Sequence, residues 1–597
     1  MPSKEQWGSR IGLILAMAGN AVGLGNFLRF PVQAVQNGGG AFLIPYFVSF
    51  LLLGIPLLWV EWTIGKYGGQ FGKHTTPFMF HQMDKRWIWK YVGVFGIFTN
   101  LAIASYYTYI ESWTIAYMYH SIVGTFDTMN QHEVATFFTN FLDVNSKTTG
   151  IPYESIVFFI ICLSLNVWIL SKGLSGGVEK ASKIGVPLLI LFGIFLAVKA
   201  LTLKAGNQGA INDGIVGLNF LWTPQFDSLS NPKVWLSAAG QIFFTLSVGM
   251  GSIHCYASYL KMRDDVALNS MAAGWTNEFI EVIIGSSIII PISIGYFGVD
   301  KVVELVQIGG LGLGFRSMPY LFEQWGPFLS ALAGFAFFGL LFFAGITSSL
   351  AMGQPVMAFL QDEFNFSRKS SAISFGITIL ILALPTIIFF EYGVFDEYDY
   401  WAGTVTLVIF AMLEVILFSW FFGIEKGWKV LNEGAEIKVP GIYKYILKYI
   451  TPLILIIIFV SSLIKPENDR WDTLFTKDYK LSSESILGKI LNKEIKHNKE
   501  FFANIYYIEF DAKVINVSNN EIEVVDNIGN KQSFKLKEDN KPLVKQGDTL
   551  KAGDALYSGF IINKIFWITA SRLLLLSVFL LIVFLVWKAY KKQKNTL

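Results

Sequence analysis

The chain has 597 residues, of which 53% are hydrophobic, 16% aromatic and only 15% charged. Soluble globular proteins carry about 25% charged residues, so this composition, with a mean hydropathy of +0.48, argues against a soluble domain and indicates a protein with many membrane spans. The net charge of +3 gives no reason to expect a nucleic-acid partner. Cys162 and Cys255 lie far apart in apolar stretches, and we expect free, packed thiols.

Apolar windows long enough to cross a bilayer, about 20 residues, recur twelve times. The first ten residues show no cleavable signal pattern, so we expect the first window to stay in the mature protein. A further Gly-rich apolar stretch, 298–325, could be re-entrant, which leaves eleven or thirteen spans as alternatives. The twelve windows lie near residues 10–36, 40–65, 90–119, 154–171, 178–201, 235–260, 267–297, 326–360, 369–391, 399–423, 444–464 and 564–588.

Basic residues are unevenly shared between the loops, which predicts the orientation. The loop after the second window is rich in Lys and Arg, whereas the loop after the third holds only Lys147. Both termini are therefore expected in the cytoplasm, in a multi-pass protein of the inner (cell) membrane. The basic residues on that side are Lys66, Lys73, Lys85, Arg86, Lys90, Lys261, Arg263, Arg368, Lys369 and those of the tail 588–597.

The first and sixth windows share an unusual feature, a polar, glycine-rich interruption at mid-depth: GNAVGLGN (19–26) and TLSVGMG (245–251). Broken helices at matching positions of two halves are typical of an inverted repeat with a binding site between them. A break frees N–H groups, which suit a carboxylate, and carbonyls, which suit a cation. An amino acid with sodium supplies both, and close helix packing through small residues is the alternative.

Several long motifs resemble the neurotransmitter:sodium symporter family, in particular its bacterial leucine transporter. The resemblance covers roughly residues 4–464 and, more loosely, 564–588. It implies an all-α membrane protein of about 12 transmembrane helices, with a 5+5 inverted repeat and broken helices 1 and 6, the LeuT fold. The motifs are residues 7–42, GIPLLWVEWTIGKYGG (54–69), YYTYIESWT (106–114), GQIFFTLSVGMG (240–251), FFAGITSSLAMGQP (342–355) and DEYDYWAGT (396–404).

The resemblance implies two sodium sites built from neutral oxygen ligands. Such ligands suit a weakly held monovalent cation, because a calcium site would gather several carboxylates. A single buried Asn or Thr is usually a helix–helix hydrogen bond, so the joint pattern carries the interpretation. The first site would use Ala21, Asn26, Thr245 and Asn277, and the second Gly19, Val22, Ala344, Thr347 and Ser348.

The resemblance also implies a site for an amino-acid substrate. Backbone around Gly23 and Gly25, with the Tyr107 hydroxyl, would receive the carboxylate. Monoamine transporters of the family place an aspartate where this chain has Gly23, so an amino acid is favoured. Because the side-chain pocket lacks charge, we expect a neutral, hydrophobic substrate. The expected substrate residues are Asn20, Ala21, Gly23, Gly25, Ile103, Tyr107, Phe244, Thr245, Ser247, Met250, Ser348 and Met352.

The resemblance also implies residues that gate the site and a carboxylate that takes the place of a bound chloride ion. Arg29 and Asp399 would form an outer ion pair above an aromatic lid of Tyr107 and Phe244; a snorkelling Arg29 is the alternative. Glu281, four residues after Asn277, stands where chloride-dependent animal members have a neutral residue, which predicts chloride independence; a structural glutamate is the alternative. Glu61 and Glu111 are expected to pair across helices. The expected inner latch comprises Lys4, Asp362 and Tyr259.

Residues 465–563 are polar and strand-like, which the resemblance does not explain. Short alternating segments at 504–510, 512–517, 521–526 and 531–536 predict a small β-rich domain outside the membrane. The expected organisation is therefore a transporter core at 1–464 with repeats near 10–201 and 235–423, an insert at 465–563, and a last span with a basic tail at 564–597. The insert could dock on the core or on an envelope partner, and a homo-oligomer is a further possibility.

The sequence thus predicts sodium-coupled symport of an amino acid by alternating access, with two sodium ions and the lipid bilayer as its surroundings. A membrane receptor that senses the amino acid with little or no transport is the alternative. No nucleophile–base constellation, phosphate loop or metal-ligand spacing indicates an enzyme.

Overall fold

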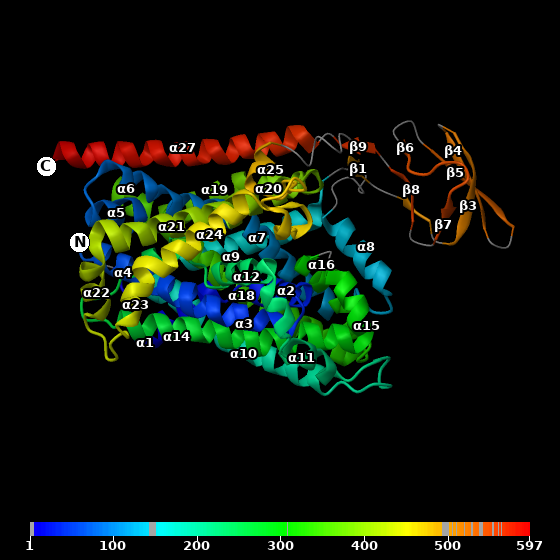
Figure 1. Cartoon of the computed structure of the whole chain (residues 1–597), viewed down its shortest axis with the longest axis horizontal. Helices are drawn as coiled ribbons and strands as arrows, with labels where there is room; N and C mark the ends of the chain where they lie inside the picture. Colours follow the sequence, from blue (N-terminus) through cyan, green and yellow to red (C-terminus); the bar gives the residue numbers. More distant parts are fainter. Residues whose placement is uncertain are drawn as a thin grey trace.

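The computed structural model describes the chain except residues 1–4, 143–150, 307–308, 492–500, 504–505, 509, 519, 527–528, 537–540, 552–553, 559, 563 and 597. Long helices form one body, and a small group of strands lies beyond one end of it (Figure 1). Both chain termini lie at the opposite end. We call these the insert end and the terminal end.

Within the described residues, ten helical segments are long and apolar enough to cross a membrane, or eleven when the bent pair α1–α2 counts as one span. They coincide with eleven of the twelve predicted windows. The sixth window forms two shorter helices, α12 and α13, with a break between them. Because of this polar break, the sixth window is not one continuous apolar helix. Counted as a span, it brings the number of crossings to twelve, and an even number agrees with both termini lying at one end.

The helices in chain order begin with the broken first span and end with the isolated last one. They are α1 Arg10–Ala21, α2 Leu24–Gln36, α3 Gly40–Ser49, α4 Ile55–Gly69, α5 Thr76–Met83, α6 Trp87–Val92, α7 Val94–Ile122, α8 Gln131–Leu142, α9 Tyr153–Ser171, α10 Glu179–Leu201, α11 Gly214–Trp222, α12 Pro232–Thr245, α13 Ser252–Ala257, α14 Val266–Glu278, α15 Ile289–Leu305, α16 Gly309–Arg316, α17 Met318–Glu323, α18 Pro327–Phe364, α19 Arg368–Ile388, α20 Val394–Tyr398, α21 Thr406–Ile416, α22 Ile424–Asn432, α23 Ile442–Tyr445, α24 Thr451–Leu463, α25 Ile486–Ile490 and α27 Lys564–Thr596.

Several spans contain a π-helical turn, among them η4 Phe279–Ile284 and η8 Asp399–Val405. Such turns are frequent at functional sites because the extra residue re-aims neighbouring side chains. The two named here carry Glu281 and Asp399. The stretch 298–325 continues α15 and then forms α16 and α17, two short helices at the insert end rather than a span.

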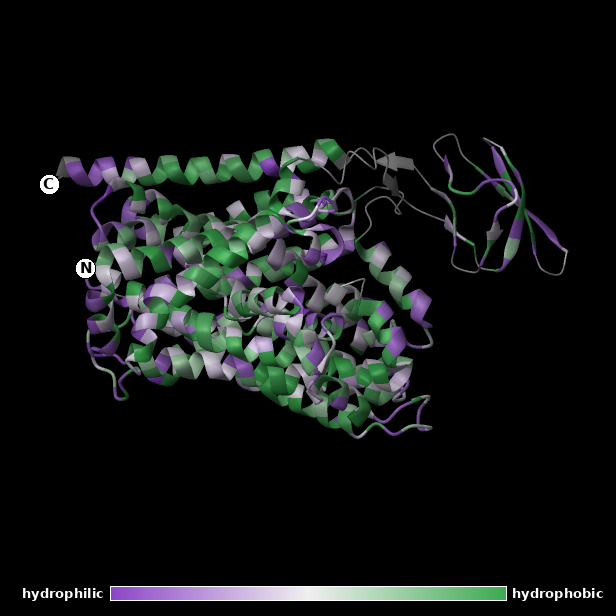
Figure 2. Cartoon of the chain, in the orientation of Figure 1, coloured by the Kyte–Doolittle hydropathy of each residue, from purple (hydrophilic) through white to green (hydrophobic). Residues whose placement is uncertain are grey.

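Apolar side chains cover the outside of the helical body, as a lipid environment requires. The hydrophobic colour follows the length of the helices, and polar residues gather at their ends (Figure 2). The helix α27 is the clearest case, because Leu573, Leu580 and Phe584 are each more than half exposed. Large apolar residues exposed along a helix would be a liability in water. Cys162 and Cys255 are buried free thiols, as predicted.

The strands form a unit with its own small core. Its main sheet is antiparallel, in the order β5-β4-β3-β7, from β3 Ala512–Val517, β4 Glu521–Asp526, β5 Lys531–Lys535 and β7 Thr549–Leu550. Val514, Ile522, Val524, Leu550 and Leu556 are buried in a cluster separate from that of the helices. The predicted strands at 512–517, 521–526 and 531–536 are confirmed; of 504–510 the described part forms β2 Tyr506–Tyr507. The other strands are β1 Phe501–Ala503, β6 Lys541–Pro542, β8 Ala555–Ser558 and β9 Phe560–Ile562.

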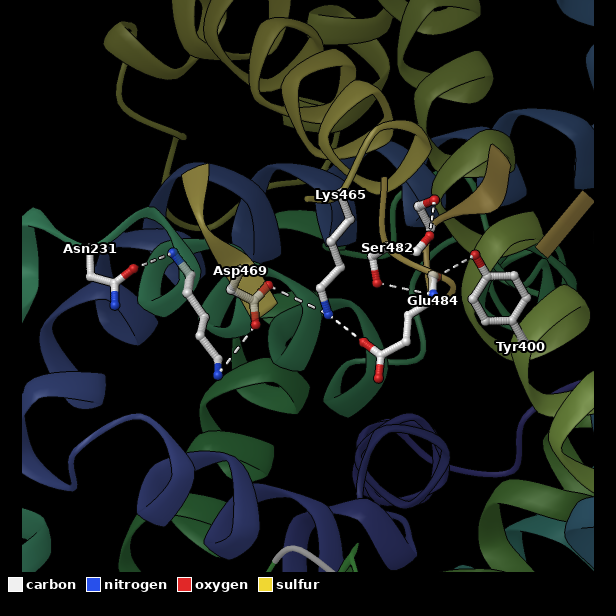
Figure 3. A network of polar contacts seen from close by, with 8 residues as sticks. Asn231, Tyr400, Lys465, Asp469, Ser482 and Glu484 are labelled. Carbon is white, nitrogen blue, oxygen red and sulfur yellow. Dashed lines mark hydrogen bonds and ion pairs between the residues drawn. The ribbon is translucent and has the colours of Figure 1, made fainter. Parts of the chain in front are cut away.

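The first part of the predicted insert belongs to the helical body instead. Residues 465–491, which we call the strap, follow α24 and are tied to α12 and η8 by polar contacts (Figure 3). Lys465 Nζ lies 2.6 Å from a Glu484 carboxylate oxygen and 3.5 Å from Asp469, which in turn pairs with Lys233 of α12 at 3.3 Å. The Tyr400 hydroxyl donates to the Glu484 carbonyl at 3.0 Å. The strap therefore joins two elements that the sequence assigns to the site.

The Lys465–Glu484 pair gives a test of the strap. Burial lowers the pKa of Lys465, but the hydrogen bond to Glu484 and the negative charges of Glu484 and Asp469 together outweigh this and raise it. The hydrogen bond to Lys465 lowers the pKa of Glu484. The pair therefore stabilises the strap at neutral pH, and this contribution is lost as the pH falls through the lowered pKa of Glu484 or rises through the raised pKa of Lys465.

We expect Lys465→Glu to lower the thermal unfolding midpoint of the purified chain slightly, because an ion pair this exposed contributes about 0–1 kcal/mol. Adding Glu484→Lys should recover most of that loss at neutral pH. A double variant that is as unstable as the sum of both single variants would show that the two side chains do not interact.

Candidate functional site

The break between α1 and α2 is held open by side chains. Gly23 is extended, and its N–H donates to the Asn26 side-chain oxygen at 2.8 Å. The next free N–H, that of Leu24, donates to the Tyr107 hydroxyl at 3.2 Å. A Cβ at position 23 would lie 2.9 Å from that hydroxyl. The exposed N-terminus of α2 and the Tyr107 hydroxyl therefore converge on one point, which suits an anionic group.

The break between α12 and α13 faces the first one. Ser247, Gly249 and Gly251 all have positive φ, at 53°, 75° and 96°. Glycine is required at 251, because a Cβ there would lie 2.8 Å from the backbone of Gly96 on α7. The Ser247 hydroxyl donates to the carbonyl of Asn20 at 2.9 Å and ties the two breaks together.

A cavity of about 340 Å³ opens between the two breaks. It runs from the backbone at Ala21 to Asp399 and the α16 glycines near the insert end. Of the twelve predicted substrate residues, Asn20 and Thr245 do not line it; they lie behind its wall, where Asn20 accepts from Ser247 and Thr245 contacts Asn26. The ten that do are Ala21, Gly23, Gly25, Ile103, Tyr107, Phe244, Ser247, Met250, Ser348 and Met352.

The residues predicted for the first sodium site are brought together. The amide of Asn26 lies 3.1 Å from the Thr245 hydroxyl and 2.9 Å from the side-chain oxygen of Asn277, and Asn277 also contacts Thr245 at 2.9 Å. Asn26, Thr245 and Asn277 are all buried. Three neutral side chains, each with an oxygen atom, thus meet from three elements, α2, α12 and α14, as the predicted site requires.

The second predicted cluster is equally compact. The Ser348 hydroxyl lies 3.3 Å from the Gly19 carbonyl, 3.5 Å from that of Val22 and 3.2 Å from that of Ala344. Thr347 contacts the Ala344 carbonyl at 3.2 Å. One hydroxyl proton can serve only one of these carbonyls at a time. Several oxygen atoms therefore gather around Ser348, as the predicted second sodium site requires.

Glu281 is buried against the first cluster and accepts three side-chain hydrogen bonds. Tyr46 donates at 2.9 Å, Gln241 at 3.0 Å, and the Thr245 hydroxyl also donates. Three hydroxyl or amide donors, one from α3 and two from α12, form a cradle for one negative charge. Through Thr245, this charge acts directly on the first ion cluster. Glu111 pairs with Asn166 across helices, as predicted, at 3.1 Å.

The outer gate residues face the cavity but do not form an ion pair with each other. The Arg29 guanidinium lies over the Phe244 ring at 4.3 Å, and Asp399 accepts from the Tyr106 hydroxyl at 2.7 Å. Phe244 and Tyr107 both line the cavity, as the aromatic lid predicts. The path from the cavity to the insert end is therefore not closed by the expected pair.

At the terminal end, by contrast, the chain is tied shut by contacts that the sequence did not indicate. The Trp7 indole donates to the Tyr256 carbonyl at 3.1 Å, and Arg368 pairs with Glu5 at 2.9 Å. His74 stacks on Tyr259 at 4.3 Å and its N–H donates to Asp362 at 3.2 Å. Lys4, the predicted latch cation, lies outside the described residues; of the latch, Asp362 and Tyr259 meet through His74.

Comparison with known proteins gives one consistent result. The sequence profile of the sodium:neurotransmitter symporter family matches residues 4–135 and 127–486. An uncharacterized sodium-dependent transporter of Methanocaldococcus jannaschii is 34% identical over 459 residues, which are 76% of this chain and 89% of that protein. Sodium-dependent nutrient amino acid transporter 1 of Drosophila persimilis is 24% identical over 520 residues, 78% of this chain and 76% of that protein.

A solved structure shares the fold. The crystal structure of MhsT in complex with L-phenylalanine superposes with a TM-score of 0.66 at 29% identity, covering 77% of this chain and all of that one. The family profile ends at residue 486, before the strand-rich unit. The predicted all-α membrane fold with broken first and sixth helices is thereby confirmed.

Proposed function

Because the chain belongs to the sodium:neurotransmitter symporter family, we propose that it carries a neutral, mainly hydrophobic L-amino acid together with two sodium ions, independently of chloride. The observation that supports this most directly is the shared wall of the cavity: Asn26 and Ser348 line it, and each also belongs to one of the predicted cation clusters. Sodium and substrate therefore bind in contact. Sodium-coupled amino-acid symport agrees with the relatives' names and with the L-phenylalanine complex of MhsT.

The chemistry of the cavity favours a neutral amino acid. Its carboxylate would meet the α2 N-terminus and Tyr107, while Ile103, Met250 and Met352 receive the side chain. Gly23 offers no carboxylate to an amine-only substrate. The charged lining residues, Arg29 and Asp399, belong to the gate. Methionine adapts to varied shapes, so several hydrophobic side chains of different size should be accepted.

Alternating access supplies the mechanism. With the terminal end tied shut and the outer pair apart, the structure has the contacts of a cavity that faces the insert end. Sodium and substrate would draw Phe244 and Arg29 over the site, after which the ties at Trp7, Arg368 and His74 must open. Each sodium that enters down a membrane potential contributes about 2.3 kcal/mol per 100 mV.

The orientation proposed from the basic loops places both termini in the cytoplasm and the strand-rich unit outside the inner (cell) membrane. The two termini at one end and the basic tail of α27 support this. The strand-rich unit, at the insert end, would then be free to meet a second copy or an envelope partner.

Uptake by proteoliposomes tests the proposal. Radiolabelled amino acids are offered in chloride-free buffer with an inward sodium gradient, and again with potassium in place of sodium. Uptake of neutral amino acids only with sodium is the expected result. Uptake that persists in potassium would overturn the two ion sites, and saturable binding without any uptake would point to the receptor alternative.

Gly25 gives a sharper test of the lid. A Cβ at this position would lie 2.2 Å from the Phe244 ring, so Gly25→Ala must displace the ring from the cavity. Overpacking of this kind costs about 1–3 kcal/mol, which corresponds to a roughly tenfold to hundredfold rise in KM. Gly240→Ala on α12 is the control, because its Cβ meets nothing within 4 Å. An unchanged KM in Gly25→Ala would refute the lid.

A further inference from the structure

A second buried polar cluster lies outside the cavity and outside both sodium clusters. It consists of His254 on α13, Glu61 on α4 and Glu414 on α21, and all three side chains are fully buried. His254 Nδ1 lies 3.2 Å from a Glu61 carboxylate oxygen, and Nε2 lies 3.3 Å from a carboxylate oxygen of Glu414. The cross-helix pairing predicted for Glu61 is thus with an imidazole that the sequence analysis did not single out.

The surroundings offer these three side chains few hydrogen-bond partners or charges. Both His254 nitrogens, one oxygen of Glu61 and both oxygens of Glu414 lack a partner with hydrogen-bond geometry among the described residues. The rings of Phe80 on α5 and Phe410 on α21 pack on the imidazole at 6.0 Å and 5.9 Å, and α7 reaches α13 through the uncharged Gly96. Among the described residues, the charged groups that act on His254 are the two glutamates.

Charge balance requires a positive ligand in this cluster. Two carboxylates beside a neutral imidazole would place two uncompensated negative charges in a site without water-exposed surface, which costs far more than a buried pair. A bound divalent metal ion would cancel both charges, whereas a proton on the imidazole would cancel one of them and a second proton on a carboxylate the other. A metal ion can take only one edge of the imidazole ring, whereas here the two nitrogens, on different edges, each face a different carboxylate. This arrangement suits protons on both nitrogens.

We infer that His254, Glu61 and Glu414 form a proton-binding site, in which an imidazolium bridges the two carboxylates and holds α13 between α4 and α21. The other oxygen of Glu61 accepts the Gly249 N–H at 2.5 Å. Gly249 lies in the break between α12 and α13, next to the cavity residue Met250. Proton binding is thereby linked to the segment that shapes the substrate cavity. When the proton leaves for water, a neutral imidazole facing two carboxylates no longer holds α13.

The proton site itself does not depend on the proposed function. Only its consequence, that proton loss favours the movement of α13 during transport, rests on the proposed function. Its sign follows from the geometry: the bridge stabilises the packed conformation in acid and is lost as the pH rises. This site is separate from Glu281, which lies on η4 and is held by Tyr46, Gln241 and Thr245.

The test compares the full-length wild type with His254→Gln between about pH 5 and pH 9, the range in which histidine titrates. The thermal unfolding midpoint of the wild type should exceed that of the variant in acid, and the difference should shrink as the pH rises. Sodium-driven uptake should depend less on pH in the variant. His120→Gln is the control, because its imidazole pairs with Glu154 near the surface, and it should keep the wild-type profile.

Parallel pH profiles of wild type and His254→Gln, in unfolding and in uptake, would overturn the inference. So would a stoichiometric metal ion in the purified wild type that is missing from His254→Gln. If His254→Gln does not fold, Glu414→Gln replaces it, with the same expected loss of the acid-side stabilisation. Sodium-dependent substrate binding, measured on the wild type and on each variant, separates the two proposals. If binding is present but the pH profile of the variant equals that of the wild type, only the proton site is rejected. If the wild type shows no sodium-dependent binding, the proposed function is rejected.

Discussion

Ser348→Ala should remove most sodium-driven uptake, because one hydroxyl serves both the second ion cluster and the substrate cavity. It lies within 3.5 Å of the Gly19, Val22 and Ala344 carbonyls and also lines the cavity. A hydrogen-bonding group that acts on a charge contributes about 1.5–3 kcal/mol. The half-saturating sodium concentration should therefore rise roughly tenfold to hundredfold, and uptake at low sodium should fall by more than tenfold.

The neighbouring serine provides a matched control. Ser349 is equally buried but points elsewhere, because its hydroxyl donates to Asn166 at 2.7 Å. Ser349→Ala should leave the sodium dependence unchanged, although the lost hydrogen bond costs about 1 kcal/mol of stability. Sodium titrations of uptake in proteoliposomes compare the two variants. If Ser348→Ala and Ser349→Ala shift the sodium dependence alike, the carbonyl cluster does not hold an ion.

The contrast between these two serines shows what the sequence could predict. The proximity of the two helix breaks could be predicted, because glycine-rich polar sequence inside an apolar window has few structural explanations. The clusters around Asn26 and Ser348 follow from that pattern and from family resemblance. Which of two neighbouring residues faces a predicted ion cluster depends on the rotation of its helix. In other spans the π-helical turns η4 and η8 alter that rotation locally, and no sequence period reveals such a turn.

Contacts between distant segments were the hardest to foresee. In the sequence, His254 is a single polar residue in an apolar segment, and only the packing of α4 and α21 places a carboxylate on each side of it. The strap was predicted as part of an outer β-domain, since charged sequence outside a span gives no indication of what it contacts. Its ties to Lys233 and Tyr400 depend on the tertiary arrangement. The outer pair of Arg29 and Asp399 is apart because each side chain has another partner, Phe244 and Tyr106.

Glu281→Ser should make uptake, which we propose to be independent of chloride, depend on chloride. The carboxylate sits in a cradle of Tyr46, Gln241 and Thr245, which all donate to it. Serine removes the charge and most of the volume, but it leaves the three donors unpaired in a buried site. Unsatisfied buried donors cost about 1–3 kcal/mol each, and the neighbouring sodium cluster loses its compensating charge. A chloride ion that enters the vacated space would satisfy both.

We expect uptake by Glu281→Ser to fall at least about tenfold in chloride-free buffer, the effect of 1.4 kcal/mol, and to recover as chloride is added, while the wild type stays indifferent to chloride. Glu111→Gln is the control for a buried carboxylate elsewhere, since Glu111 accepts from Asn166, which is not one of the three donors to Glu281. Adding gluconate in place of chloride shows whether a higher ionic strength alone restores uptake. If uptake recovers with gluconate, or does not recover with chloride, Glu281 stabilises the fold without standing in for an anion. If uptake recovers with chloride alone, the Glu281 carboxylate supplies the negative charge that balances the sodium sites.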